Sequence, residues 1–216
     1  MLKIQGEAVA SVQQLREYIK KVNKNVPQSV LDMIEYYIEE GKAEGIRGDI
    51  AFAQSCLETG NFTFKDSAVT LEQNNFAGLG VTQQGMRGNA FSDAKTGIRA
   101  QIQHLKAYAN KESLNNTCVD VRFSYVTRGT APYVEWLGIQ ENPNGGGWAS
   151  GKNYGNKIID ILNQIIYVFL TIFLYLLKCP QSLILSALRA FCFCGKPHIS
   201  RSIFLYFRYQ AWLKSW

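Results

Sequence analysis

A single carboxylate, Glu58, stands at the end of the mostly apolar run Ala51–Glu58. At the C-terminal end of an apolar helix a carboxyl group faces the negative end of the helix dipole and loses hydration, and both effects raise its pKa. A glutamic acid that stays protonated near neutral pH can act as a general acid. The pattern therefore indicates proton donation by Glu58, and a solvated glutamate at a helix end is the alternative.

Helical periodicity predicts the elements that hold this carboxyl group in place. Five helices are expected, at about 11–22, from Pro27 to about 40, at 49–58, at 96–110 and from Tyr154 to about 162. Residues 61–95 are rich in glycine and asparagine and predict a small irregular or β-hairpin lobe. We therefore predict an α+β fold, mainly α, in which this small lobe stands beside a helical lobe.

The charge of the chain is unevenly distributed. Its net charge of +6 comes from residues 161–216, which hold six lysines and arginines and no acidic residue, whereas residues 1–160 hold 17 residues of each sign. A nucleic-acid-binding domain carries a basic face on the folded domain itself. The charge pattern therefore argues against a nucleic-acid partner, and the length of 216 residues fits one domain plus an appendage.

The five cysteines fit neither a disulfide framework nor a metal site. Their number is odd and their spacing irregular, and Cys192 and Cys194 with His198 match no common zinc pattern. We expect Cys56 to be a buried free thiol, with a Cys56–Cys118 bridge as the alternative. No metal and no cofactor are expected.

Several motifs follow one another in a specific order. They are Glu58-Thr-Gly-Asn-Phe62, Asn74-Asn-Phe-Ala-Gly-Leu-Gly80, Phe91-Ser-Asp-Ala-Lys-Thr-Gly97 and Trp148-Ala-Ser-Gly-Lys-Asn-Tyr154. In this order they resemble the glucosaminidase family of bacterial peptidoglycan hydrolases, over about residues 1–165. The last motif departs from the family pattern, because Ser150, Gly151 and Lys152 replace its Thr-Asp-Pro.

The resemblance implies a lysozyme-like fold and cleavage of the β-1,4 bond after N-acetylglucosamine in peptidoglycan glycan strands, with Glu58 as the acid. Tyr154 matches the closing tyrosine of the family, and its phenol is expected to hydrogen-bond the N-acetyl group. The residues expected to bind the sugar are Asn75, Phe76, Gly78, Trp148 and Trp136. For Tyr154 and Trp136, a place in the hydrophobic core is the alternative.

The second catalytic group has three candidates. Related enzymes place a second acid on the smaller lobe, which favours Asp93, although Asp93 can equally cap the helix near Thr96. Glu72 is expected at the surface, and His104 is expected to be structural rather than a base. A third route needs no second carboxylate, because the 2-acetamido oxygen of the substrate can attack the anomeric carbon.

Two other functions are compatible with the same residues. A lytic transglycosylase or muramidase acts on the same polymer, and lysozyme-like folds also work with one glutamate. The second is an inactive protein that binds the cell wall or is tethered to a membrane, with a cleft that binds glycan but does not cleave it. The intact Glu58 argues against this last function.

Residues 166–216 are predicted to be a hydrophobic, basic tail outside the catalytic domain, residues 1–165. The uncharged run Ile165–Leu177 has 13 residues, fewer than the about 20 of a membrane-spanning helix. A membrane anchor through 165–177 and a non-native, frame-shifted extension both fit this tail. The N-terminus lacks the layout of a secretory signal. We therefore expect the protein to reach the cell wall by another route, such as phage lysis, with a true start upstream as the alternative. We also expect a monomer.

Overall fold

The computed structural model describes residues 1–81 and 85–177, with side chains up to Tyr167. Its helices are α1 (Val12–Val22), α2 (Gln28–Glu44), α3 (Gly48–Glu58), α4 (Ala94–Ala109) and α5 (Tyr154–Leu177), with three short 3-10 helices, η1 (Leu71–Gln73), η2 (Phe123–Tyr125) and η3 (Val134–Leu137). The mainly helical fold predicted from the sequence is confirmed. The chain divides into two compact units, Met1–Leu170 and Thr171–Trp216.

The ends of the helices follow local sequence signals. Ser11 and Gln14 form a reciprocal capping box at the start of α1, and Pro27 precedes the first residue of α2. Gly45 ends α2 in the left-handed conformation, with a φ of 70°. These signals explain why the five predicted helices are confirmed. The ends of the first four shift by a few residues, whereas α5 continues to Leu177, well beyond the predicted end near residue 162.

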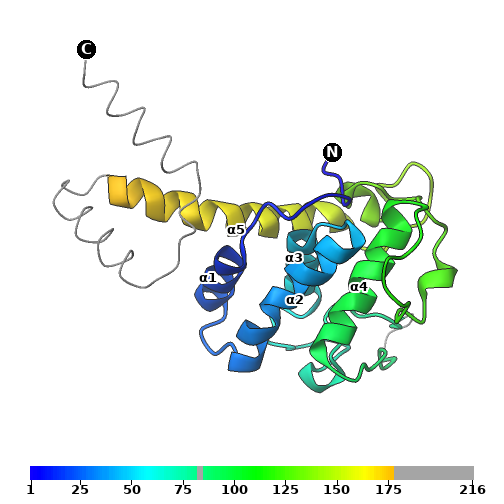
Figure 1. Cartoon of the computed structure of the whole chain (residues 1–216), viewed down its shortest axis with the longest axis horizontal. Helices are drawn as coiled ribbons and strands as arrows, with labels where there is room; N and C mark the ends of the chain where they lie inside the picture. The colour runs from blue at the N-terminus through cyan, green and yellow to red at the C-terminus, as the bar shows by residue number, and fades with distance from the viewer. Residues whose placement is uncertain (82–84, 178–216) are drawn as a thin grey trace, which may run out of the picture. The chain divides into compact units, whose positions relative to one another are not determined.

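Helix α3 is the buried centre of the first unit. Every residue from Gly48 to Cys56 is buried, and α2 and α4 both pack against this helix. At Gly48 a Cβ atom would lie 2.0 Å from the carbonyl oxygen of Tyr37, so α2 and α3 approach more closely than any side chain allows. Figure 1 shows α2 and α4 lying side by side. The central helix therefore carries Glu58 to a fixed point at its C-terminal end.

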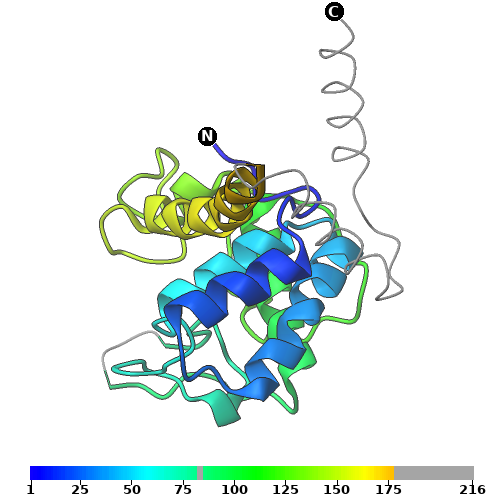
Figure 2. The same cartoon turned by 90° about the vertical axis from the view of Figure 1, so that its left-hand side faces the viewer.

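The smaller lobe, residues 59–93, is irregular. Within residues 1–81 and 85–177 the structure has no β-strand, only three isolated β-bridges, and none of them lies in this lobe. The irregular alternative is therefore confirmed and the β-hairpin is wrong for the described residues. Figure 2 shows the lobe, in cyan to green, at one end of the helices.

Side-chain amides organise this irregular lobe in place of strand pairing. Asn75 is buried and its Nδ2 atom donates to the carbonyl oxygens of Leu79 and Asn89, at 2.8 and 2.9 Å. The Nε2 atom of Gln73 donates to Gly88 O at 2.9 Å. Buried backbone carbonyls must find donors. In this lobe the two side-chain amides supply them, whereas in a β-sheet the N–H groups of a neighbouring strand would.

The predicted boundary at residue 165 falls inside α5, which continues to Leu177. No helix within the described ranges is long and apolar enough to cross a membrane. Residues 178–216, most of the predicted tail, lie outside the described residues. Cys56 is a buried free thiol as predicted, and Cys118 is also free, so the Cys56–Cys118 bridge is absent.

Candidate active site

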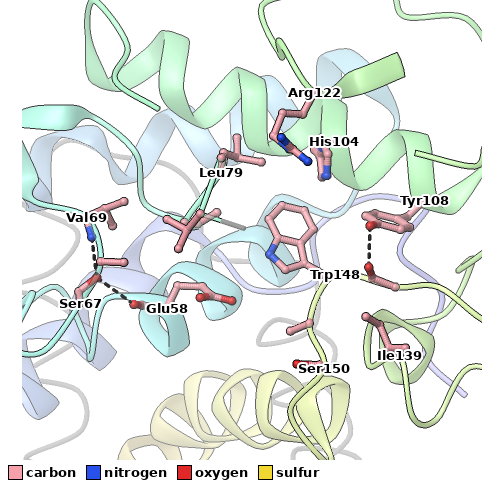
Figure 3. A pocket seen from close by; sticks show the side chains of 17 residues that line it. Glu58, Ser67, Val69, Leu79, His104, Tyr108, Arg122, Ile139, Trp148 and Ser150 are labelled. Atoms are coloured by element: carbon pink, nitrogen blue, oxygen red, sulfur yellow. Dashed lines mark hydrogen bonds between the residues drawn. The ribbon is translucent and has the colours of Figure 1, made fainter. Parts of the chain in front are cut away.

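A cleft of about 520 Å³ opens where the C-terminal end of α3 meets the smaller lobe and the wall formed by α4 and the segment 147–150. Figure 3 shows the side chains that surround it. They come from segments far apart in the sequence: Glu58, residues 67–69 and 77–81, His104, Tyr108, Arg122, Ile139 and residues 147–150. The fold therefore brings both lobes to one cavity around Glu58.

Glu58 is the one carboxylate among the described residues that line this cleft. A Cβ atom added at Gly78 would lie 3.7 Å from Glu58 Oε2, so a glycine here keeps the space beside that oxygen free. The Oγ atom of Ser67 donates to the backbone carbonyl of Glu58 at 3.3 Å, and thereby ties the smaller lobe to the end of α3. Burial raises the pKa of Glu58, and a hydrogen bond from Tyr154 opposes this rise.

Tyr154, the first residue of α5, is buried behind Glu58. Its hydroxyl group donates to Glu58 Oε1 and accepts from Gln54 Nε2 at 2.9 Å. The single proton of the phenol is therefore committed to Glu58. Since Oε1 receives this hydrogen bond, a proton on the neutral acid resides on Oε2, the oxygen beside Gly78.

A chain of buried hydrogen bonds continues behind Gln54. Gln101 Nε2 on α4 donates to Gln54 Oε1 at 2.9 Å, Ser55 Oγ donates to Gln101 Oε1 at 3.0 Å, and Tyr37 OH donates to Ser55 Oγ at 2.9 Å. Every donor in this chain points towards Glu58. Because aligned hydrogen bonds polarise one another, the chain fixes the orientation of the Tyr154 hydroxyl.

An aromatic wall faces Glu58 across the cleft (Figure 3). The Trp148 indole lies edge to face with the His104 ring, with 4.8 Å between centroids. Tyr108 OH donates to the carbonyl oxygen of Gly147 at 2.7 Å and thereby holds the residue before Trp148 against α4. This wall presents a flat apolar ring together with polar edges, the combination that sugar rings favour.

Comparison with known proteins decides the family. Residues 34–166 match the family model for glucosaminidase, described as mannosyl-glycoprotein endo-beta-N-acetylglucosaminidase. The chain belongs to the glucosaminidase family. It is also 38% identical over 156 residues to an uncharacterized protein of Borreliella burgdorferi strain B31, covering 72% of each chain. No solved structure matches.

The family resemblance inferred from the motifs is thereby confirmed. This glucosaminidase is a glycosidase of the kind that acts on peptidoglycan. The matched segment begins within α2 and ends within α5. It therefore contains the whole cleft, from Glu58 to the aromatic wall.

Four of the predicted site residues meet at this cleft. Glu58, Gly78 and Trp148 line it, and Tyr154 supports Glu58 from behind. The hydroxyl of Tyr154 is held between Gln54 and Glu58, and its expected hydrogen bond to the N-acetyl group stays a prediction. The contact that the structure shows for the Tyr154 hydroxyl group is with Glu58.

The structure places Asn75, Phe76 and Trp136 away from the cleft lining. Asn75 holds the turn before Leu79 and Phe76 is buried beside Phe62, with 6.0 Å between the ring centroids. Trp136 packs edge to face on Tyr133 at 5.0 Å, at the margin of the core. Of the five residues expected to bind the sugar, only Gly78 and Trp148 line the described cleft.

Asp93 is the N-cap of α4. Its side chain is exposed, accepts from Thr96 N at 2.8 Å and from Ser92 Oγ at 2.7 Å, and does not line the cleft. These hydrogen bonds, the one from Thr96 first, hold the pKa of Asp93 below its ordinary value. The capping role is therefore the one that the structure shows, and exposed Glu72 on η1 is likewise outside the cleft lining.

Several residues at the site were missed by sequence analysis. Gln54 and Ser55 interrupt an otherwise apolar helix, and a buried polar side chain must find a partner, so this interruption was a usable signal. Asp120 and Arg122 carried no such signal, because a connecting loop is expected to be polar. His104, expected to be structural, lines the cleft while its Nδ1 atom lies 2.7 Å from Asp120 Oδ2.

Proposed function

We propose that this glucosaminidase is an endo-β-N-acetylglucosaminidase that hydrolyses the β-1,4 bond after N-acetylglucosamine in peptidoglycan, with Glu58 as general acid. The observation that supports this most directly is the state of Glu58. Its carboxyl group has a raised pKa, lies at a cleft and has one oxygen held by Tyr154. A raised pKa favours the protonated form that a general acid needs, and the hydrogen bond from Tyr154 leaves Oε2 as the oxygen that carries the proton.

The first chemical step transfers this proton. Glu58 Oε2 gives its proton to the glycosidic oxygen, the bond from that oxygen to the anomeric carbon breaks, and the leaving sugar departs with a hydroxyl group. No second carboxylate lines the cleft among the described residues. The acetamido carbonyl oxygen of the N-acetylglucosamine therefore attacks the anomeric carbon and forms an oxazolinium ion.

The second step regenerates the acid. A water molecule attacks the anomeric carbon, the bond to the acetamido oxygen breaks, and Glu58 takes the proton released by the water. The product has the original β configuration because two displacements have occurred. Tyr154 stabilises the intermediate carboxylate by donating to Oε1 throughout both steps.

The proposal is tested with the full chain and two glutamate variants. Glu58→Gln removes the acidic proton with little change in shape, and Glu17→Gln makes the same substitution at an exposed position of α1. We expect Glu17→Gln to clear cell-wall material in a zymogram like the wild type and Glu58→Gln to leave the material intact. Clearing by Glu58→Gln at the wild-type rate would overturn the assignment.

The single carboxylate at the cleft also fits a lytic transglycosylase, which needs one acid and no attacking water. Mass spectrometry of digested sacculi distinguishes the two reactions. Reducing N-acetylglucosamine ends support the proposed hydrolase, and anhydro-muramic ends support the transglycosylase. Proton NMR of the first product tests the acetamido route, because net inversion excludes it.

A further inference from the structure

The charge of the cleft is concentrated at one residue. Arg122 is the one described lining residue with a permanent positive charge. No salt bridge forms to its guanidinium group within the described ranges, where its side chain contacts the ring of Tyr125 at 5.1 Å. Glu58, the one carboxylate on the described lining, forms no ion pair with Arg122, so the cleft offers an unpaired cation to whatever binds there.

The backbone that carries Arg122 is held rigidly. Buried Gln103 on α4 accepts from Val119 N at 2.8 Å and from Asp120 N at 3.3 Å through Oε1. Its Nε2 atom donates to Thr117 O at 2.9 Å. Gln103 thus holds the backbone of residues 117–120, just before Arg122, against α4, the helix that forms the cleft wall.

Asp120 completes this support. One carboxylate oxygen accepts from Arg122 N at 2.9 Å, and the other pairs with His104 Nδ1 at 2.7 Å. Asp120 is buried, and His104 lies against Trp148. The cation, the histidine and the aromatic ring are therefore parts of one preorganised wall (Figure 3).

The polymer proposed above supplies a matching group. In peptidoglycan each N-acetylglucosamine is flanked by muramoyl residues, whose lactyl group ends in a carboxylate or continues into a stem peptide with carboxylates of its own. Cleavage after N-acetylglucosamine places a muramoyl residue on each side of the sugar at Glu58. In Figure 3 Arg122 lies on the side of Trp148 away from Glu58. A glycan strand with one sugar at Glu58 would place a neighbouring sugar on this side if it runs along the wall past Trp148.

We propose that Arg122, held by Asp120 and Gln103, is an anion-binding subsite that selects glycan strands bearing carboxylates on the muramoyl residue. This inference rests on the proposed function, because it assumes that glycan strands occupy the cleft. Guanidinium groups bind carboxylates through two parallel hydrogen bonds. Such a subsite would favour cell-wall strands over uncharged polymers of N-acetylglucosamine.

The test measures binding without turnover, in the full-length Glu58→Gln protein. Isothermal titration gives dissociation constants for three glycans of equal length: a chitin oligosaccharide, a peptide-free muramoyl glycan and the same glycan with stem peptides. Arg122→Gln is added to this background, with Lys20→Gln on exposed α1 as a control that removes the same charge. The measured quantity is the affinity ratio of each anionic glycan to the neutral one.

We expect the parent protein to prefer an anionic glycan and Arg122→Gln to reduce that preference about tenfold, as for a hydrogen bond between charged groups. Lys20→Gln should keep the ratio, and Arg122→Lys should keep part of it. A preference for the peptide-free glycan identifies the lactyl carboxylate, and a preference limited to the peptide-bearing glycan identifies the stem peptide.

An unchanged ratio in Arg122→Gln overturns the inference, as does a parent protein that binds neutral and anionic glycans equally well or binds none of the three. The proposed cleavage is judged separately by the ends of the products that the wild type releases from sacculi. A protein that produces reducing N-acetylglucosamine ends but shows no anionic preference therefore retains the proposed function and loses the subsite.

Discussion

Two glutamates, the buried Glu44 on α2 and the half-buried Glu58 on α3, have opposite shifts of their pKa. Glu44 receives Lys106 Nζ and the backbone N–H groups of Asn115 and Asn116, each at 2.9 Å. Burial acts to raise the pKa of Glu44, but these hydrogen bonds together with the charge of Lys106 leave it below the ordinary value of 4.5. Glu58 has one neutral donor, Tyr154, and its pKa is raised.

The difference shows how one residue type serves stability in one region and chemistry in another. At the interface of α2 and α4 the carboxylate is compensated by a cation and by N–H donors, so its charge links two helices and the segment after α4. At the end of α3 compensation is incomplete, so burial leaves the pKa of the Glu58 carboxyl group raised. Incomplete compensation is the property that suits Glu58 to the acid role proposed above.

Glu58→Gln should have the largest effect on activity. Loss of the general acid is expected to lower the rate of wall hydrolysis about 10³-fold or more, while the melting temperature stays at or above that of the wild type. The physical reason is that glutamine keeps an oxygen for Tyr154 but has no transferable proton. Turbidity loss of sacculi and a thermal melt measure the two quantities, and a 10-fold rate loss or less would contradict general acid catalysis by Glu58.

Lys106→Met should have the largest effect on stability. Removing the cation leaves Glu44 buried with an uncompensated charge, and the free energy of unfolding is expected to fall by about 3–5 kcal/mol. Urea denaturation at neutral pH measures this change. The double variant Lys106→Met/Glu44→Gln should recover part of the loss, because the amide oxygen still accepts from Asn115 and Asn116; a loss below about 1 kcal/mol in the single variant would contradict the comparison.

The helices were predictable from the sequence because periodicity and capping residues are local signals. Ser11, Pro27 and the periodic spacing of apolar residues determine where each helix begins, and they do so independently of the tertiary contacts. The position of Glu58 at the end of a buried helix was predictable for the same reason. The family followed from the order of motifs around that residue.

The partners of Glu58 were less predictable because they come from distant segments. Gln101 meets Gln54 across 47 positions in the sequence, and on a mostly polar helix it resembles any solvated side chain. Asp93 fits both a catalytic acid and a helix cap by residue type and spacing, and only the direction of its side chain separates the two. Sequence patterns report the period of a helix, whereas such contacts depend on how helices pack.

Tyr154→Phe should give a smaller loss of activity together with a characteristic pH shift. Without the donor to Oε1 the carboxylate form of Glu58 loses stabilisation, so its pKa rises further. Because the acid works only while protonated, the alkaline limb of the kcat/KM profile should move to higher pH. We expect a roughly tenfold lower kcat/KM at the optimum, from the loss of one hydrogen bond to a charged group.

The control for this variant is Tyr133→Phe, which removes a phenol hydroxyl outside the cleft lining. Its pH profile should coincide with that of the wild type. An alkaline limb that stays in place or moves to lower pH in Tyr154→Phe would show that the hydroxyl does not act on Glu58.

The smallest expected effect is in the pH dependence of stability. The folded state binds the Glu58 proton more tightly than the unfolded chain does, so this group stabilises the fold at low pH. That contribution is lost as the pH rises from about the ordinary value of 4.5 through the raised pKa. The pKa of Glu44 is lowered, so its contribution is present above 4.5 and is lost as the pH falls.

Urea titrations of the wild type and Glu58→Gln over this pH range separate the two glutamates. In the variant the decline towards higher pH should disappear, while the loss of stability in acid, which Glu44 causes, should remain. The variant is therefore expected to be the more stable protein above the raised pKa, since the wild type must then bury a charge that no cation compensates. Parallel curves for the two proteins would mean that Glu58 ionises as freely in the cleft as in water.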